Sequence, residues 1–247
     1  MFIPVNREEM KALGWDQLDV ILVTGDAYID HPSFGAAIVG KYLVSNGFRT
    51  GIISQPDINS NRDFNKLPKP LLFIGITSGN ADSMVNNYTS SKKRRKSDNY
   101  SEGGLNRKRP DRAVIVYANK IRENFKDVPV ILGGMEASLR RVAHYDYWSD
   151  RIRRSIIFDA KADLVVFGAG ERTVLKIAKK LRSGKRINRI RDLRGTAFVA
   201  ERSEAPPGRY FYKELKSFEN ISSSKEDFFE SEKILHSVTN PYFGTGL

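Results

Sequence analysis

Acidic, hydroxyl, amide and glycine residues recur directly after short apolar runs in the first 171 positions. The four places where this happens are Gly25-Asp26, Ser78-Gly79-Asn80, Gly133-Gly134 and Gly168-Ala169-Gly170-Glu171. In a parallel sheet the ends of such runs meet at one edge, and ligands bind there. Carboxylates and amides orient polar ligands, while glycine N–H groups at helix starts suit phosphate. The spacing therefore predicts one ligand-binding rim.

The rim candidates come from these turns, from the loop 25–35 and from two crowded polar segments, 78–89 and 136–150. They are Asp26, Tyr28, Asp30, His31, Ser78, Asn80, Asp82, Ser83, Asn86, Gly133, Gly134, Glu136, Ser138, Arg140, Arg141, His144 and Glu171. Each group also has a structural interpretation. Capped turns explain the Asn, Ser and Asp clusters, tight turns explain the glycines, and a buried network explains the arginines and aromatics of 136–150.

Several kinds of site are excluded or weakly supported. The chain contains no cysteine, which excludes disulfides, a thiol nucleophile, thiolate zinc sites and an iron–sulfur cluster held by this chain. Its three histidines lie far apart, so no metal site is expected. No P-loop pattern occurs, and the glycines of 168–170 do not complete a dinucleotide fingerprint. Asp30-His31 lacks the D-x-H-x-x-G spacing typical of cobalamin binding, which leaves ligation by His31 as an alternative without a motif.

Charge indicates a different kind of partner. The net charge is +12 and the isoelectric point is about 9.8. Residues 92–112 carry nine basic and three acidic side chains, and 171–194 carry ten and two. Such runs favour a polyanion, RNA or DNA, or are simply solvated. The nucleic-acid candidates are Lys92, Lys93, Arg94, Arg95, Lys96, Arg107, Lys108 and Arg109.

The elements that must position these residues follow a strand–helix rhythm. Strands are expected at 18–24, 51–54, 71–76, 128–132 and 162–167, with an edge strand at 196–200; helices are expected at 33–46, 112–125 and 173–181. Runs that are apolar on both faces and separated by helices indicate an α/β fold with a mostly parallel sheet covered on both faces. Residues 1–200 form the expected domain, with a long basic loop at 80–110. Residues 201–247 are expected to be a polar, acidic strap with a short helix at 224–235.

The N-terminus lacks the features of a signal peptide, and no apolar run is long enough to span a bilayer. No membrane partner is therefore expected, and the cytoplasm is the expected compartment.

The longer motifs, read together, resemble the N-terminal region of the YgiQ family of radical-SAM proteins. The resemblance is carried by Gly25 to Gly35, Ser78-Gly79-Asn80, Asp82 to Asn86, Arg109 to Arg112, Gly133 to Arg141 and His144 to Asp150. It implies a Rossmann-like domain of the cobalamin-binding-domain kind. It also implies a barrel beyond this chain, joined in cis or acting in trans, whose C-x-x-x-C-x-x-C motif holds a 4Fe-4S cluster that binds S-adenosylmethionine.

The resemblance leaves the reaction unassigned and implies that this chain holds neither cofactor. On this reading it is an accessory domain that covers or selects the substrate and is inactive alone, and Asp26, Asp30, Asn80 and Glu136 are expected to line one cavity. A stand-alone nucleic-acid-binding module and a cobalamin- or nucleotide-binding domain are the alternatives.

Overall fold

The computed structural model describes residues 2–201 and 213–239. These residues belong to two compact units. The first contains 1–141 and 156–199, and the second contains 142–155 and 200–247. The second unit thus takes in a segment, 142–155, that the sequence analysis assigned to the first domain.

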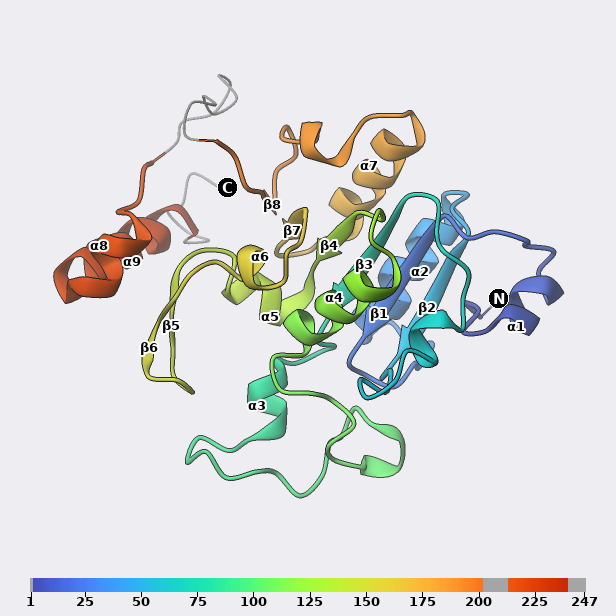
Figure 1. Cartoon of the computed structure of the whole chain (residues 1–247), viewed down its shortest axis with the longest axis horizontal. Helices are drawn as coiled ribbons and strands as arrows, with labels where there is room; N and C mark the ends of the chain where they lie inside the picture. The colour runs from blue at the N-terminus through green and yellow to red at the C-terminus, as the bar shows by residue number, and fades with distance from the viewer. Residues whose placement is uncertain (1, 202–212, 240–247) are drawn as a thin grey trace. The chain divides into compact units, whose positions relative to one another are not determined.

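A six-stranded sheet lies at the centre of the first unit (Figure 1). Its strands are β1 (Val20–Thr24), β2 (Thr50–Ser54), β3 (Phe73–Thr77), β4 (Val130–Leu132), β7 (Leu164–Val166) and β8 (Thr196–Ala197). The order is β2-β1-β3-β4-β7-β8; the first five are parallel and β8 runs antiparallel to β7. Strand β2 lies on one side of β1, and β3, β4 and β7 follow on the other side. The strand order therefore reverses between β1 and β3, and their carboxyl ends form the topological switch point, where open α/β sheets bind ligands.

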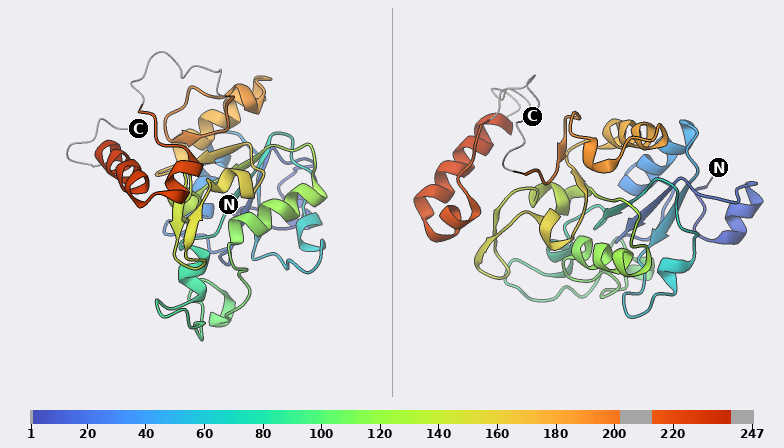
Figure 2. Two further views of the ribbon diagram at one scale, coloured as in Figure 1. Left: turned by 60° about the vertical axis from the view of Figure 1, so that its left-hand side comes forward. Right: turned by 45° about the horizontal axis from the view of Figure 1, so that its top comes forward.

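Helices cover both faces of this sheet, which confirms the predicted α/β fold. The helices of the first unit are α1 (Arg7–Ala12), α2 (Gly35–Ser45), α3 (Ser83–Asn87), α4 (Ala113–Asn124), α5 (Gly134–Leu139), α6 (Ile156–Asp159) and α7 (Glu171–Arg182), with short 3-10 helices η1 (Asp63–Asn65), η2 (Glu102–Gly104) and η3 (Ile187–Arg189). Helices α2 and α7 lie side by side over one face, and α4 covers the other (Figure 2). Helices α1, α3, α5 and α6 were not predicted from the sequence pattern, and all of them are short.

The two faces have separate apolar cores because alternate residues of each strand point to opposite sides. Leu22, Phe73 and Ile131 pack with the residues of α2 and α7. Ile21 and Ile74 pack instead with α4. Burial on both faces explains why the strands appear in the sequence as continuous apolar runs.

The polar segment 80–110 is held by hydrogen bonds along much of its length. It contains α3 and η2, and isolated antiparallel bridges join Tyr88 to Arg94 and Ser97 to Leu105. The backbone N–H of Ala27, just after β1, donates to the carbonyl of Tyr100 over 2.8 Å. The segment is therefore attached to the switch-point edge of the sheet.

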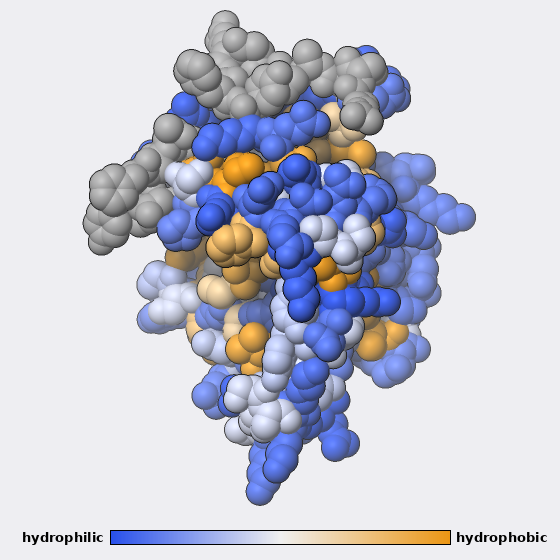
Figure 3. Space-filling view, turned by 90° about the vertical axis from the view of Figure 1, so that its left-hand side faces the viewer, coloured by the Kyte–Doolittle hydropathy of each residue, from blue (hydrophilic) through white to orange (hydrophobic). Residues whose placement is uncertain are grey.

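The second unit contains an antiparallel hairpin and two helices. They are β5 (His144–Asp146), β6 (Arg151–Arg153), α8 (Phe218–Ser223) and α9 (Lys225–Thr239). The short helix expected at 224–235 is α9, which is longer than expected, whereas the hairpin was not predicted. The described part of the expected strap is therefore largely helical, and the rest of that strap lies outside the described residues. Figure 3 shows one face of the molecule, which is mostly hydrophilic with separate apolar patches.

Within residues 2–201 and 213–239, no helix combines the length and apolar character needed to cross a membrane.

Candidate ligand-binding site

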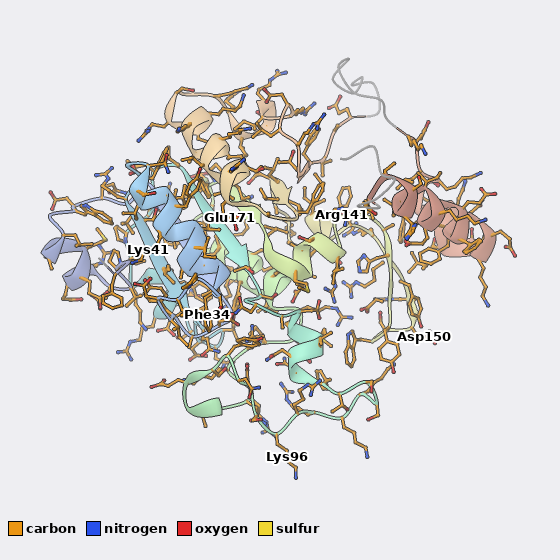
Figure 4. All side chains as sticks on the ribbon, turned by 180° about the vertical axis from the view of Figure 1, so that it is seen from behind. Phe34, Lys41, Lys96, Arg141, Asp150 and Glu171 are labelled. Atoms are coloured by element: carbon orange, nitrogen blue, oxygen red, sulfur yellow. The ribbon has the colours of Figure 1, made fainter. Side chains whose placement is uncertain are left out.

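A cavity of about 540 Å³ opens at the carboxyl edge of the sheet in the first unit. Residues of β1, β3, β4 and β7 form its floor, and the starts of α2, α5 and α7 form its walls. Figure 4 labels Phe34 and Glu171, which lie at the starts of α2 and α7. The cavity thus occupies the edge at which the strand order predicts a ligand.

The floor of the cavity is apolar. It is formed by Leu22, Phe73, Ile131 and Val166, which project from four neighbouring strands toward α2 and α7. Val174 of α7 closes one side. These side chains offer no hydrogen bonds, so the floor suits the hydrophobic part of a ligand.

Glycines keep the cavity open, because seven of its lining positions have no side chain. Local geometry favours glycine at several of these positions, and Gly75 and Gly134 are two of them. A Cβ on Gly75 of β3 would come within 2.9 Å of the Leu22 side chain. Gly134 has a φ of +78°, a left-handed conformation that favours glycine, and a Cβ there would overlap the Thr77 side chain.

Four polar side chains line the cavity: Thr77, Asn80, Ser138 and Glu171. Ser138 donates to the carbonyl of Gly134 over 2.7 Å within α5. The side-chain oxygen of Asn80 lies 3.4 Å from the backbone N–H of Gly35. The site thus combines an apolar floor with a few polar groups, as small-molecule sites usually do.

Five of the predicted rim residues line this cavity: Asn80, Gly133, Gly134, Ser138 and Glu171. The expectation that Asp26, Asp30, Asn80 and Glu136 share a cavity is wrong for this one, because only Asn80 lines it. Asp30 forms an ion pair with Lys41 at 2.8 Å. Asp26 and Glu136 are buried in networks of their own.

The first network is a buried ion cluster of Asp26, Asp98 and Arg109. The side chain of Arg109 is fully buried, and its Nη2 lies 2.8 Å from Asp26 and 3.2 Å from Asp98. Its Nη1 donates to the carbonyl of Ser78, after β3. Asp26 also accepts the backbone N–H of Asn80 over 2.7 Å. Arg109 therefore joins the end of the basic loop to the carboxyl ends of β1 and β3.

The two acids of this cluster differ in electrostatics although they share one arginine. Burial raises the pKa of Asp26 above its ordinary value, and the charge of Arg109 only partly offsets this. Burial also acts to raise the pKa of Asp98, but hydrogen bonds, among them the N–H of Tyr100, and the Arg109 charge outweigh it, so the pKa falls. Asp98 is thus the better stabilised anion of the pair.

The second network centres on Glu136, which joins three helices. Glu136 lies in α5, and its carboxylate accepts the backbone N–H of Ser83 over 2.9 Å and that of Val114 over 3.2 Å. These donors are in the first turns of α3 and α4, whose N–H groups need acceptors. Burial raises the pKa of Glu136. This carboxylate connects helices and does not face the cavity.

Replacing Glu136 with glutamine is expected to change how stability depends on pH. The folded pKa of Glu136 is raised above the unfolded one, so folding takes up a proton, and the wild type loses stability as pH rises through that interval. Glutamine does not titrate. The free energy of unfolding of E136Q minus that of the wild type should therefore increase toward neutral pH, by about 1.4 kcal/mol for each pH unit by which the pKa is raised.

Urea unfolding at a series of pH values measures this difference. Glutamine also loses one acceptor, which adds an offset that does not vary with pH, so the slope is the diagnostic quantity. E123Q, on the exposed side of α4, is the control and should run parallel to the wild type. If the difference in unfolding free energy between E136Q and the wild type does not vary with pH, the raised pKa of Glu136 is contradicted.

The other predicted rim residues make local contacts away from the cavity. Tyr28 accepts the backbone N–H of Ile3, His31 accepts that of Ser33, and Ser78 donates to the carbonyl of Ala81. Asp82 caps α3 and pairs with Arg140, and Ser83 accepts the N–H of Ala113. Asn86 lies against Asp98, and Arg141 stacks on Phe167 at 4.8 Å. His144 belongs to the second unit, where its Nδ1 lies 3.1 Å from the carbonyl of Val142. The crowded polar segments therefore serve mainly to hold the backbone.

The basic loop divides into exposed and buried residues. Lys92, Lys93, Arg94, Arg95, Lys96, Arg107 and Lys108 are exposed. Arg109 is removed from the nucleic-acid candidates, because its guanidinium is buried against two carboxylates. Arg95 also serves the loop itself by donating to the carbonyls of Val85 and Tyr88. Binding of a polyanion by the exposed residues stays a prediction.

Several cavity residues were not among the sequence candidates, and Thr77, Met135 and Leu139 are three of them. Thr77 is the last residue of β3, so its position directly before Ser78 was the available signal. Met135 and Leu139 are four residues apart on α5 and remain more than half exposed. Two apolar residues on a short helix have no sequence signal that separates exposed lining residues from core residues.

The residues present do not fit a 4Fe-4S cluster. The chain contains no cysteine, and no group of three His, Asp or Glu side chains suited to a metal occurs in residues 2–201 and 213–239. His31 does not line the cavity. No step of a reaction is therefore assigned to a metal on this chain.

Comparisons with known proteins agree with the motifs. Over 242 residues the chain is 54% identical to a UPF0313 protein of Thermotoga maritima, covering 98% of this chain and 42% of that protein. It is 57% identical over 244 residues to a UPF0313 protein of Pseudomonas aeruginosa, covering 99% of this chain and 31% of that protein. The chain thus spans less than half the length of these relatives.

A search of solved structures matched the chain to the radical S-adenosylmethionine methyltransferase TsrM of Kitasatospora setae. The TsrM structure with tryptophan and a SAM analog is 18% identical, with a TM-score of 0.47, and the match covers 74% of this chain and 29% of TsrM. The structure with cobalamin and a [4Fe-4S] cluster is 17% identical, with a TM-score of 0.48, and that match covers 81% and 31%.

The family model described as "Radical SAM N-terminal" matches residues 2–247. This match and the relatives confirm the resemblance that the motifs indicated. The chain belongs to the Radical SAM N-terminal family.

Proposed function

We propose that this domain binds the small molecule on which a radical-SAM reaction is carried out, and that the cluster and S-adenosylmethionine are held by residues outside this chain. The observation that carries the proposal is the cavity of about 540 Å³ at the carboxyl edge of the sheet. Its size falls in the range typical of small-molecule sites. The chain has no cysteine to ligate a 4Fe-4S cluster, which supports a division between binding and radical chemistry.

Two further features support a covering or selecting role. Met135 and Leu139 leave apolar surface exposed at the cavity, with exposed fractions of 54% and 60%. Exposed apolar side chains that rim a pocket are typical of surfaces that contact a ligand or another part of a protein. The UPF0313 relatives are more than twice as long as this chain, so they contain further chain in cis.

Filling the cavity is expected to weaken the binding of apolar molecules. Ala36 lies in the first turn of α2 and lines the cavity, so a phenylalanine there would occupy its space. The probe is the neutral dye N-phenyl-1-naphthylamine, whose fluorescence rises in apolar surroundings. We expect saturable binding of one equivalent by the wild type and binding at least about tenfold weaker by A36F, a difference of about 1.4 kcal/mol.

The control is A12F, on the exposed side of α1 and away from the cavity. Both substitutions have a similar cost in helix propensity, which separates occupation of the cavity from general loss of stability. Equal dye binding by wild type, A12F and A36F would show that the dye does not enter this cavity and would contradict the proposal.

A further inference from the structure

Two polar side chains in the cavity have hydrogen-bonding capacity that the protein does not use. Glu171 is half-buried at the start of α7, and within the described residues its carboxylate makes neither a hydrogen bond nor an ion pair. Asn80 is also half-buried; its oxygen faces the N–H of Gly35, and its amide hydrogens have no acceptor in the described part of the chain. The cavity thus presents one acceptor and one donor.

The other polar groups of the cavity are already engaged. Ser138 donates to Gly134 and lies 3.4 Å from the N–H of Gly168. Thr77 accepts the N–H of Gly79 over 3.1 Å and donates to the same residue's carbonyl. The strongest uncommitted acceptor is therefore the carboxylate of Glu171.

The helix dipole explains part of this arrangement, because an acid in the first turn stabilises a helix wherever it points. The dipole does not require the carboxylate to line an apolar cavity, where it loses solvation. A ligand that carries a positive charge or an N–H group restores that interaction with a charge-assisted hydrogen bond. An anionic ligand would instead meet a like charge at this position.

We propose that the cavity takes a small molecule with an apolar body and an amine or ring N–H that donates to Glu171, together with an acceptor atom that receives the amide of Asn80. This selectivity rests on the proposed function of the cavity as the ligand site. The same chemistry occurs in an amino acid, whose ammonium is the donor, and in a nucleobase, whose ring N–H is the donor.

The experiment compares two probes of similar shape and opposite charge, phenethylamine and 3-phenylpropionate, by calorimetric titration of the full chain. The wild type is expected to bind phenethylamine at least about tenfold more tightly, which is the scale of a hydrogen bond to a charged group. In E171Q this preference should disappear, mainly through weaker binding of phenethylamine. The matched control is E8Q, which removes a first-turn acid of α1 that does not line the cavity, and it should keep the preference.

The outcomes separate this inference from the proposed function. If both probes bind equally to the wild type and A36F blocks both, the cavity remains the ligand site and the role of Glu171 is overturned. If E171Q keeps the preference, the role of Glu171 is also overturned. If neither probe binds, the proposed function fails together with the inference. Titrations with L-phenylalanine and with adenine then distinguish the two sources of the donor, since the favoured one should also lose about tenfold in E171Q.

Discussion

Replacing Arg109 with methionine is expected to destabilise the first unit by about 3–5 kcal/mol, the usual result of removing one partner from a buried ion pair. Methionine fills much of the same volume but leaves Asp26 and Asp98 buried without their cation. The carbonyl of Ser78 loses its donor as well. Because this cluster joins the basic loop to the ends of β1 and β3, the loop should also become more susceptible to proteolysis.

Urea unfolding of R109M and wild type measures the loss. R107M is the control, because Arg107 is exposed in the same loop, and its effect should stay within about 0.5 kcal/mol. The triple variant D26N/D98N/R109M removes all three charges, and it should lose at least about 1 kcal/mol less than the sum of the single effects. A small loss in R109M, or strict additivity, would show that the cluster is not coupled.

Replacing Gly79 with alanine is expected to cost about 3 kcal/mol. Gly79 has a φ of +105°, which an L-residue adopts only under strain. Its added Cβ would lie 2.6 Å from Nη1 of Arg109 and would overlap the carboxylate of Asp26. Strain of about 1–2 kcal/mol adds to about 1–3 kcal/mol for overpacking against atoms that are themselves held in place.

The matched control is G14A. Gly14 also has a positive φ, +70°, but no atom lies within 4 Å of a Cβ added there. It therefore carries the strain without the collision. Denaturant unfolding should place G79A clearly below G14A, by at least about 1 kcal/mol. Equal losses of unfolding free energy in G79A and G14A would mean that the side chains of the ion cluster rearrange around the added methyl group without destabilising the protein.

The strands, the main helices and the family were determined by the sequence itself. The apolar runs that became β1, β3, β4 and β7 are buried on both faces, and the turns after them marked the edge that carries the cavity. These features are local and periodic, so they are visible without a structure. The absence of cysteine, also visible in the sequence, excludes a cluster held by thiolates of this chain.

The roles of the charged residues were decided only by the tertiary structure. Asp26, Arg109 and Glu136 were assigned to ligand contacts, yet each is buried against partners far away in the sequence, such as Asn80 for Asp26 and Ser83 for Glu136. An acid after a strand has the same sequence signature whether it faces a ligand or is buried against a cation. The partner that neutralises or solvates it distinguishes the two, and that partner is brought near by folding. Glu171 stands apart from the other buried or half-buried acids at this edge because, among the described residues, folding brings no partner to it.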